Sequence, residues 1–362
     1  MDGVCQVYRQ DCELMTGPFT RWWTSTNRPQ VFYTGPGEAC AVVLLNQTQI
    51  PGTPEHNRTC SPGFPNALND PYEGELFTWW LYFFADLDQD EKDYLWEYKR
   101  PQLRRVEYNG SVVDVVPSDG EPYGEVRNYT GAPVVHPTPP ETFGPITVQE
   151  GFWFSSHEQW KLLQMPYTDI PIVEKLFHNA ERVRTCNSVL MKENAGFFAS
   201  INNVTNKATN DVYGYISPAG VPSVGSQQAQ ELDMITPYAA FPVFLFNETV
   251  GMVWYHNMLL GKGMQNPYGS TEATRRDGSA ISNLVTWDSK VLGLLGLLGG
   301  TGDITRNKMQ RDGIYDEFLR VTEREYTGVF GDISTIKGSD IDMCWPDYQT
   351  PHNAVEDFTE CQ

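Results

Sequence analysis

Apolar residues recur along the chain with the spacing of buried helices. Residues 75–85, ELFTWWLYFFA, are almost wholly apolar after one acidic residue, which predicts a helix buried on nearly all sides. Helical periodicity recurs in later segments, namely 91–100, 157–164, 172–184, 237–246, 249–260, 288–298 and 306–326. Because Gly-, Asn- and Ser-rich loops separate many of these segments, the pattern predicts a mainly α toroid whose helices form the scaffold and whose loops form a groove.

Two regions depart from this helical pattern. Residues 1–70 are rich in Pro, Gly, Asn, Thr and Cys, which predicts a loop-rich segment held by disulfides. Residues 107–145 carry Val-Val pairs and several prolines, which predicts an excursion of loops and short strands. We interpret this excursion as an insertion and not as a linker. Residues 71–362 are therefore expected to form the helical toroid, within a chain that is a single domain overall.

The chain is strongly acidic, with a formal net charge of −20 and a sequence pI near 4.6. This charge would repel nucleic acid and anionic membrane surfaces. The longest candidate for a membrane span, residues 291–298, is far shorter than the roughly 20 residues that cross a bilayer. We therefore expect neither nucleic acid nor a membrane as a partner, and we expect a monomer.

Sequons and cysteines indicate a secretory history. Asn-x-Ser/Thr triplets without a central Pro occur at Asn46, Asn57, Asn109, Asn128, Asn203 and Asn247. The seven Cys show no metal-ligand spacing, so we expect disulfides and no metal or organic cofactor, with one thiol either unpaired or paired with a group outside this chain. Residues 1–4 do not begin a signal peptide, so we expect that a leader has been removed or that the chain begins within a longer protein. The expected location is extracellular.

The first candidate for chemistry is Glu75, at the start of the apolar helix 75–85. A carboxyl group half-buried beside Phe77 and Trp79 would have a raised pKa, as a general acid needs. The alternative is that Glu73 and Glu75 only complement the positive end of the helix dipole.

A second cluster combines stacking rings with hydrogen-bonding groups in a short segment, at Trp153, His157, Glu158 and Trp160. Rings beside polar groups suit a sugar subsite. Alternatively, Trp153 and Trp160 belong to the core and His157 caps a helix.

The third cluster is the Gly-bounded loop 266–278, whose charged and aromatic residues are Tyr268, Glu272, Arg275, Arg276 and Asp277. Trp287 and Asp288 follow at the start of an almost uncharged helix. As an N-cap, Asp288 would accept hydrogen bonds from free amides, and those donors would also keep it ionised, as a general base requires. No GxSxG elbow supports a serine hydrolase.

Four short motifs, in this order, resemble the fungal endo-β-1,2-glucanases, a glycoside hydrolase family with an (α/α)6 barrel. They are YEGEL at 72–76, GPITV at 144–148 followed by Trp153 and His157, YGSTE at 268–272 and WDSK at 287–290. The resemblance covers roughly residues 72–326. It implies internal hydrolysis of a β-glucan, above all β-1,2-glucan, with inversion at the anomeric carbon.

The resemblance implies Glu75 as the general acid and Asp288 as the general base. The glucan would be held by Trp153, His157, Glu158, Trp160, Tyr268, Glu272, Arg275, Arg276 and Trp287. A twelve-helix barrel needs more helices than the pattern predicts, so we expect a barrel that is incomplete at the N-terminus. If residues 107–145 are not an insertion, the spacing from Glu75 to Asp288 is long for the family, and Glu158 or Glu272 becomes the rival acid.

Two other functions stay open at this point. A non-catalytic glucan-binding or cell-wall glycoprotein would keep the aromatic groove without cleaving the polymer. Another carbohydrate-active toroid, such as a polysaccharide lyase, acts on uronates, which an acidic groove repels unless cations gather there. Such a cluster would have to come from Arg182, Arg184, Arg275 and Arg276.

Overall fold

The structure is a computed structural model that describes residues 154–190, 234–261 and 287–346 continuously. It also describes shorter segments at 75–84, 88–89, 92, 105–108, 126–128, 145–149, 196–197, 204–206, 212–213, 221, 224, 264–266, 269–275 and 280–282. The chain groups into two compact units, residues 1–101 and 102–362, and each is described by itself. The predicted boundary at residue 70 and the predicted disulfides of residues 1–70 lie outside the described residues.

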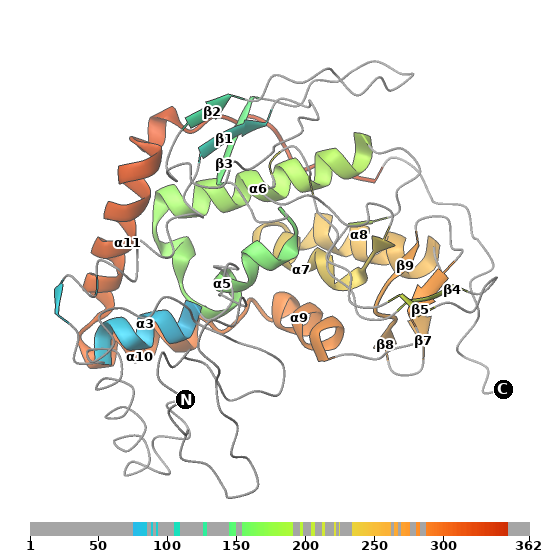
Figure 1. The fold of residues 1–362 in the computed structure, drawn as a ribbon, viewed down its shortest axis with the longest axis horizontal. Coiled ribbons are helices and arrows are strands. Elements are labelled where there is room, and N and C mark those ends of the chain that lie inside the picture. The colour runs from blue at the N-terminus through green and yellow to red at the C-terminus, as the bar shows by residue number, and fades with distance from the viewer. Residues whose placement is uncertain are drawn as a thin grey trace, which may run out of the picture. The chain divides into compact units, whose positions relative to one another are not determined.

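Helices account for most of the described residues (Figure 1). The first unit contains α3 (Glu75–Phe84). The second contains α5 (Trp160–Gln164), α6 (Pro171–Leu190), α7 (Phe241–Phe246), α8 (Glu248–Gly261), α9 (Trp287–Leu297), α10 (Gly302–Asp312) and α11 (Tyr315–Phe330). Short 3-10 helices are η3 (Ser156–Gln159), η4 (Tyr167–Asp169), η6 (Pro237–Ala240) and η7 (Ile333–Thr335). Each predicted helical segment is confirmed in type except 91–100, which lies outside the described residues apart from Lys92.

The apolar helix α3 differs from the prediction in its burial. Trp79 and Tyr82 are buried, and their rings lie 5.5 Å apart in an edge-to-face arrangement. Leu76 and Phe84 are exposed. The prediction that this helix is buried on nearly all sides is therefore wrong at Leu76 and Phe84.

The main core of the second unit surrounds α7, which contacts α8 and α9. Phe241 on α7 and Trp254 on α8 are fully buried. The Trp254 ring lies 4.7 Å from the ring of Phe197. Every position of α7 is apolar (FPVFLF), as expected for a helix that the core covers on several sides. Truncating a side chain such as Trp254 to Ala would cost about 3–5 kcal/mol.

A second cluster joins α6 to strand β3 (Ile146–Gln149). Ile146 and Val148 pack against Val183 of α6 in this cluster. Asn179, which is fully buried, donates from Nδ2 to the carbonyl oxygens of Thr147 at 2.8 Å and Lys337 at 2.7 Å. These bonds satisfy the buried carbonyl of Thr147 and hold the C-terminal segment beside the strand.

The predicted helix 306–326 is divided in the structure at Gly313. Gly313 has φ +73°, a left-handed conformation that glycine adopts at little cost. The amide of Gly313 donates to the carbonyl of Gln310, and the amide of Ile314 donates to that of Met309, which terminates α10. The hydrophobic period continues across this break, which is why the periodicity alone predicted a single helix.

Short strands form three small sheets. The first, of order β2-β1-β3, joins β3 to β1 (Arg105–Tyr108) and β2 (Val126–Asn128), so the short strands predicted for the excursion are confirmed where the structure describes it. A five-stranded sheet, which the sequence did not predict, has the order β5-β4-β10-β9-β6. Its strands are β4 (Val204–Asn206), β5 (Val212–Tyr213), β6 (Met234–Ile235), β9 (Thr274–Arg275) and β10 (Ala280–Ser282). The third pairs β7 (Gln265–Asn266) with β8 (Gly269–Ser270).

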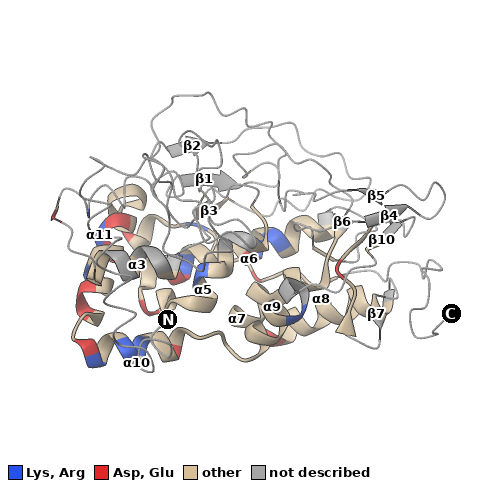
Figure 2. Cartoon of the chain, turned by 60° about the horizontal axis from the view of Figure 1, so that its bottom comes forward, with Lys and Arg blue, Asp and Glu red and all other residues tan. Residues whose placement is uncertain are grey.

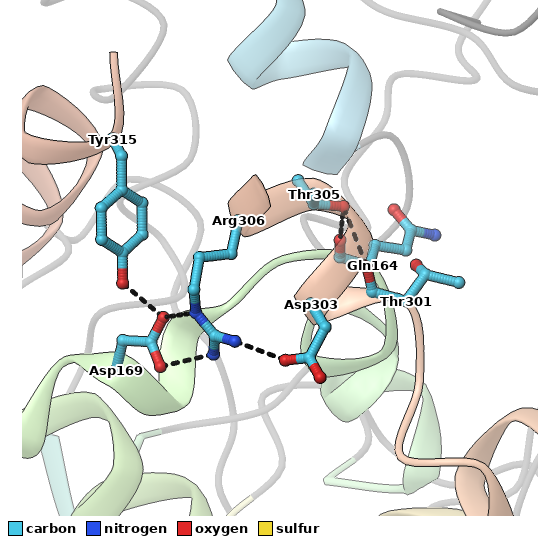
Figure 3. Close-up of polar contacts among 7 residues, drawn as sticks. All are labelled: Gln164, Asp169, Thr301, Asp303, Thr305, Arg306 and Tyr315. Carbon is cyan, nitrogen blue, oxygen red and sulfur yellow. Dashed lines mark hydrogen bonds and ion pairs between the residues drawn. The ribbon is translucent and has the colours of Figure 1, made fainter. Parts of the chain in front are cut away.

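A polar clasp, made of Asp169, Arg306 and Tyr315, joins η4 to α10 and α11 (Figure 3). Arg306 donates from Nε and from Nη2 to the Asp169 carboxylate, each at 2.6 Å. The Tyr315 hydroxyl donates to the same carboxylate at 2.5 Å. Arg306 also pairs with Asp303.

Charged residues gather on α10 and α11, whereas α7 carries none (Figure 2).

A disulfide joins Cys186 of α6 to Cys344 of the C-terminal segment, with the two Cα atoms 4.8 Å apart. This pair confirms the prediction of disulfides for the part of the chain that the structure describes. Within that same part, no helix is both long enough and apolar enough to cross a membrane.

Candidate functional site

The predicted acid and base belong to different units of the structure. Glu75 is the first residue of α3, as predicted, and Asp288 lies in the first turn of α9. The side chains of both residues lie outside the described part of the structure. Asp288 follows the first residue of its helix, whereas the N-cap prediction placed it just before the helix. The distance between the two carboxyl groups stays a prediction.

The segment that contains Glu158 has an unusual backbone. Phe154 has φ +54°, which is uncommon for a residue other than glycine, and its side chain is buried. Buried Ser155 follows it, and buried Ser156 begins η3, which also contains His157 and Glu158. Such a conformation costs on the order of 1–3 kcal/mol, and it clusters at functional sites, where the surroundings hold it in place. Trp153 and the side chains of His157 and Glu158 lie outside the described residues.

Trp160 begins α5 and packs, partly buried, against the main core. This packing agrees with the alternative interpretation that Trp160 belongs to the core. Binding of glucan by its remaining exposed surface stays a prediction.

Glu272 lies between β8 and β9 and is only 1% exposed. The neighbouring Thr271 and Ala273 are also buried, and the amide of Thr271 donates to the carbonyl of Met264 at 2.9 Å. Carboxylates are almost never buried to this extent without partners. Because its carboxyl group is withdrawn from solvent, Glu272 is better placed to hold the loop than to reach a sugar. Tyr268, Arg276 and the side chain of Arg275 lie outside the described residues.

Lys290 connects this loop to the start of α9. A Cβ built on Gly269 would lie 3.4 Å from Cδ of Lys290 and 3.7 Å from its Nζ, so the lysine side chain runs along the face of Gly269. Burial lowers the pKa of Lys290, and the nearby charge of Glu272 opposes this lowering. The structure therefore brings together two of the predicted segments, loop 266–278 and the helix start at 287–290.

This arrangement favours an ionised carboxylate at the start of α9. Free amides and the positive end of the helix dipole stabilise negative charge in a first helical turn. A general base must be ionised, so the backbone position of Asp288 suits that role.

The comparisons with known proteins identify the family. The family model described as endo-beta-1,2-glucanase SGL matches residues 5–119 and 137–362. The chain belongs to this endo-β-1,2-glucanase family. The unmatched residues 120–136 lie inside the region that was interpreted as an insertion. No curated protein matches the chain significantly.

Two solved structures of an endo-β-1,2-glucanase from Talaromyces funiculosus are similar to this family member. One is a complex with sophorose, with 46% sequence identity and a TM-score of 0.71. The other is a Glu-to-Gln variant in complex with β-1,2-glucan, with 46% identity and a TM-score of 0.72. Each match covers 94% of this chain and 62% of the other chain. The endo-β-1,2-glucanase fold confirms the predicted class, a mainly α helical barrel.

Among the residues that the structure describes, this family member has no group of three or more His, Cys, Asp or Glu that could hold a metal ion. The expectation that the protein needs no metal or organic cofactor stays a prediction.

The sequence did not point to a pocket of about 220 Å³ between α6, the α7–α8 junction and the C-terminal segment. Its lining includes His178, Arg182, Asp342 and Trp345. The α6 residues lie more than 150 positions before the C-terminal ones in the sequence, so no local motif connects them. Asn247, a predicted glycosylation site, also lines this pocket.

Proposed function

We propose that the chain hydrolyses internal linkages of β-1,2-glucan. The observation that carries this proposal is the 46% identity over 94% of the chain to an enzyme solved in complex with sophorose and with β-1,2-glucan. The chain spans 62% of that enzyme, so the activity of the whole enzyme is assigned to this chain as a proposal. The substrate is a polysaccharide or oligosaccharide, and the acting form is a secreted, glycosylated monomer.

The proposed mechanism uses two carboxyl groups and inverts the anomeric carbon. Glu75 protonates the leaving oxygen, directly or through a substrate hydroxyl, and Asp288 activates the attacking water. An inverting pair leaves room for that water, so the two carboxyl groups should lie roughly 6.5–9.5 Å apart or be joined through a relay. The position of Asp288 in the first turn of α9 supports the ionised state that a base needs.

Glu158 is the rival acid that the structure supports best. It follows the strained backbone at Phe154, a kind of strain that occurs at functional sites. Glu272 is almost completely buried, so we assign it a positioning role in the loop.

Two alternative functions are a polysaccharide lyase and a non-catalytic glucan-binding protein. A lyase would need several free arginines, but Arg184 is buried and donates to Glu181 at 2.7 Å and to the carbonyl of Ala239 at 2.8 Å. Arg184 is therefore already committed within the core. A non-catalytic glucan-binding protein would bind the polymer and release no products.

The experiment is a comparison of the wild type with Glu75→Gln, Glu158→Gln, Glu272→Gln and Asp288→Asn on linear β-1,2-glucan. Proton NMR during early turnover reads the anomer of the new reducing end, and inversion gives the α-anomer first. The assigned acid and base lose activity by about 10²-fold or more. Full activity in Glu75→Gln with loss in Glu158→Gln would move the acid to Glu158. A β-anomer as the first product would contradict inversion.

A further inference from the structure

The pocket beside the α7–α8 junction has a sequon in its wall. Asn247, Glu248 and Thr249 form an Asn-x-Thr triplet, and Asn247 lines the pocket of about 220 Å³. Asn247 and Thr249 are both exposed. The side chains of the other five sequon asparagines lie outside the described residues. Asn247 is thus an exposed sequon asparagine whose neighbouring side chains the structure describes.

The hydrogen bonding of Asn247 is compatible with modification. Its Oδ1 accepts a hydrogen bond from the amide of Val250 at 3.1 Å, which caps the start of α8. This cap uses the amide oxygen and not Nδ2, the atom to which an N-linked glycan is attached. A glycan on Nδ2 would therefore leave the helix cap in place.

The pocket has the chemistry that recognises a neutral sugar. Trp345 is 50% exposed and offers an aromatic face. His178 stacks on Phe246, with the ring centres 5.1 Å apart and the planes at 12°. Arg182 and Asp342 supply a donor and an acceptor of opposite charge, so the pocket favours hydroxyl and amide groups over a net charge. Its volume is below the roughly 300–1,000 Å³ of drug-sized pockets, which suits one sugar ring.

We propose that Asn247 carries an N-linked glycan and that the first N-acetylglucosamine of this glycan lies in the pocket against Trp345. The inference rests on the secretory history included in the proposed function. In the secretory pathway, Nδ2 of Asn247 forms a bond to C1 of the reducing-end N-acetylglucosamine of a polyprenyl-diphosphate-linked oligosaccharide. The C1–O bond to the diphosphate breaks, the diphosphate leaves with the electron pair, and the Nδ2 proton passes to a base of the transferase.

The seated sugar would cover an exposed aromatic residue at the C-terminal segment. Cys344, which is next to Trp345, forms the disulfide with Cys186 and so holds this segment against α6. The indole Nε1 of Trp254 also donates to the carbonyl of Cys344 at 2.9 Å. The aromatic platform is therefore adjacent to a fixed part of the backbone, as a binding face requires.

The test uses the full chain secreted from a eukaryotic host. Peptide mass spectrometry before and after enzymatic deglycosylation reads the occupancy of Asn247. Hydroxyl-radical footprinting reads the accessibility of Trp345. Thr249→Ala is the central variant, because it destroys the sequon and leaves the Asn247 cap intact. Thr249→Ser is the matched control, because it keeps the sequon.

We expect an occupied Asn247 and about two-fold or greater protection of Trp345 in the wild type and in Thr249→Ser. The protection should disappear in Thr249→Ala, with circular dichroism unchanged. An unoccupied Asn247 in the secreted chain overturns the proposal. Equal labelling of Trp345 in the wild type and in Thr249→Ala overturns the seating of the sugar. Neither readout involves glucan cleavage, so a failure of the proposed enzymatic function would be recognised separately.

Discussion

Arg306 and Asp169 form a two-pronged ion pair, with Nε and Nη2 of the arginine each 2.6 Å from an oxygen of the carboxylate, although 137 residues separate them in the sequence (Figure 3). Two parallel charge-assisted hydrogen bonds are stronger than a single contact. The pair is partly buried, so solvent screens it less than an exposed pair. It attaches α10 to the segment that follows α5.

Replacing Arg306 with Met should lower the free energy of unfolding by about 1–3 kcal/mol, because the substitution leaves Asp169 partly buried without its cation. Urea denaturation measures this change. The control is Arg320→Met, which removes an exposed pair with Glu317 and should cost below about 1 kcal/mol. Equal losses of unfolding free energy in the two variants would contradict the larger contribution that we assign to the Arg306–Asp169 pair.

Acid should weaken the fold first through His178. Burial, and then the charge of Arg182, lower the pKa of His178 from 6.5 to about 4. The unfolded chain therefore binds a proton more readily, so the contribution of neutral His178 is fully present above pH 6.5 and is lost as the pH falls toward 4. The loss should be on the order of 1 kcal/mol after solvent screening. His178→Phe keeps the stack on Phe246 and should flatten this part of the stability profile, and an unchanged profile would contradict the assignment.

A second loss at lower pH should come from Asp169. Burial alone would raise the pKa of this carboxyl group, but hydrogen bonds from Arg306 and Tyr315 lower it below 3.8. The stabilisation is present above the pKa of the unfolded state and disappears as the pH falls below it. Unfolding of Asp169→Asn, followed between pH 5 and pH 2, should depend less steeply on pH than unfolding of the wild type. A steeper dependence would contradict this account.

Two glycines should respond to Ala in opposite directions. Gly313 has φ +73°, so Gly313→Ala should destabilise the protein by about 1 kcal/mol. Gly328 lies inside α11, and a Cβ there would meet nothing within 4 Å. Gly328→Ala should therefore stabilise by about 0.5–1 kcal/mol. Thermal unfolding of both variants checks the signs, and a shift in the same direction would contradict the division of the helix at Gly313.

Lys290 should contribute to both stability and activity. Its partly buried ammonium lies near the charge of Glu272, which is only 1% exposed, so Lys290→Met removes a compensating cation and should lower the free energy of unfolding by about 1–3 kcal/mol. The same variant should lower kcat on β-1,2-glucan by about 10-fold or more, since it disturbs the contact between loop 266–278 and the helix start that carries the proposed base. The control is Lys308→Met on α10, which should leave kcat unchanged. Full activity of Lys290→Met would remove this lysine from the account.

Much of the fold was predictable because burial leaves a local pattern. The segment FPVFLF of α7 is apolar at every position, and the structure surrounds it with core. The break at Gly313 also has a local signal, a glycine after Arg311 in the last turn of α10, but the continuing hydrophobic period obscured it. The five-stranded sheet had no such signal, because strands as short as Thr274–Arg275 are too brief to show an alternation.

The site was predictable only in part. The loop that carries Glu272 and the helix start that carries Lys290 were both singled out, and the structure places them together. The pocket with Arg182 and Trp345 was not predicted, because it depends on a tertiary contact between α6 and the C-terminal segment. The strain at Phe154 is a backbone property that its residue type does not signal.

The most direct test of the central claim is the size distribution of products from linear β-1,2-glucan. The purified chain should shorten the polymer early in the reaction and release short β-1,2-linked oligosaccharides, while β-1,3- and β-1,4-glucans stay intact. Chromatography with mass detection over a time course measures both. Glucan that binds the protein but keeps its full length throughout would contradict the account and favour a non-catalytic binding protein.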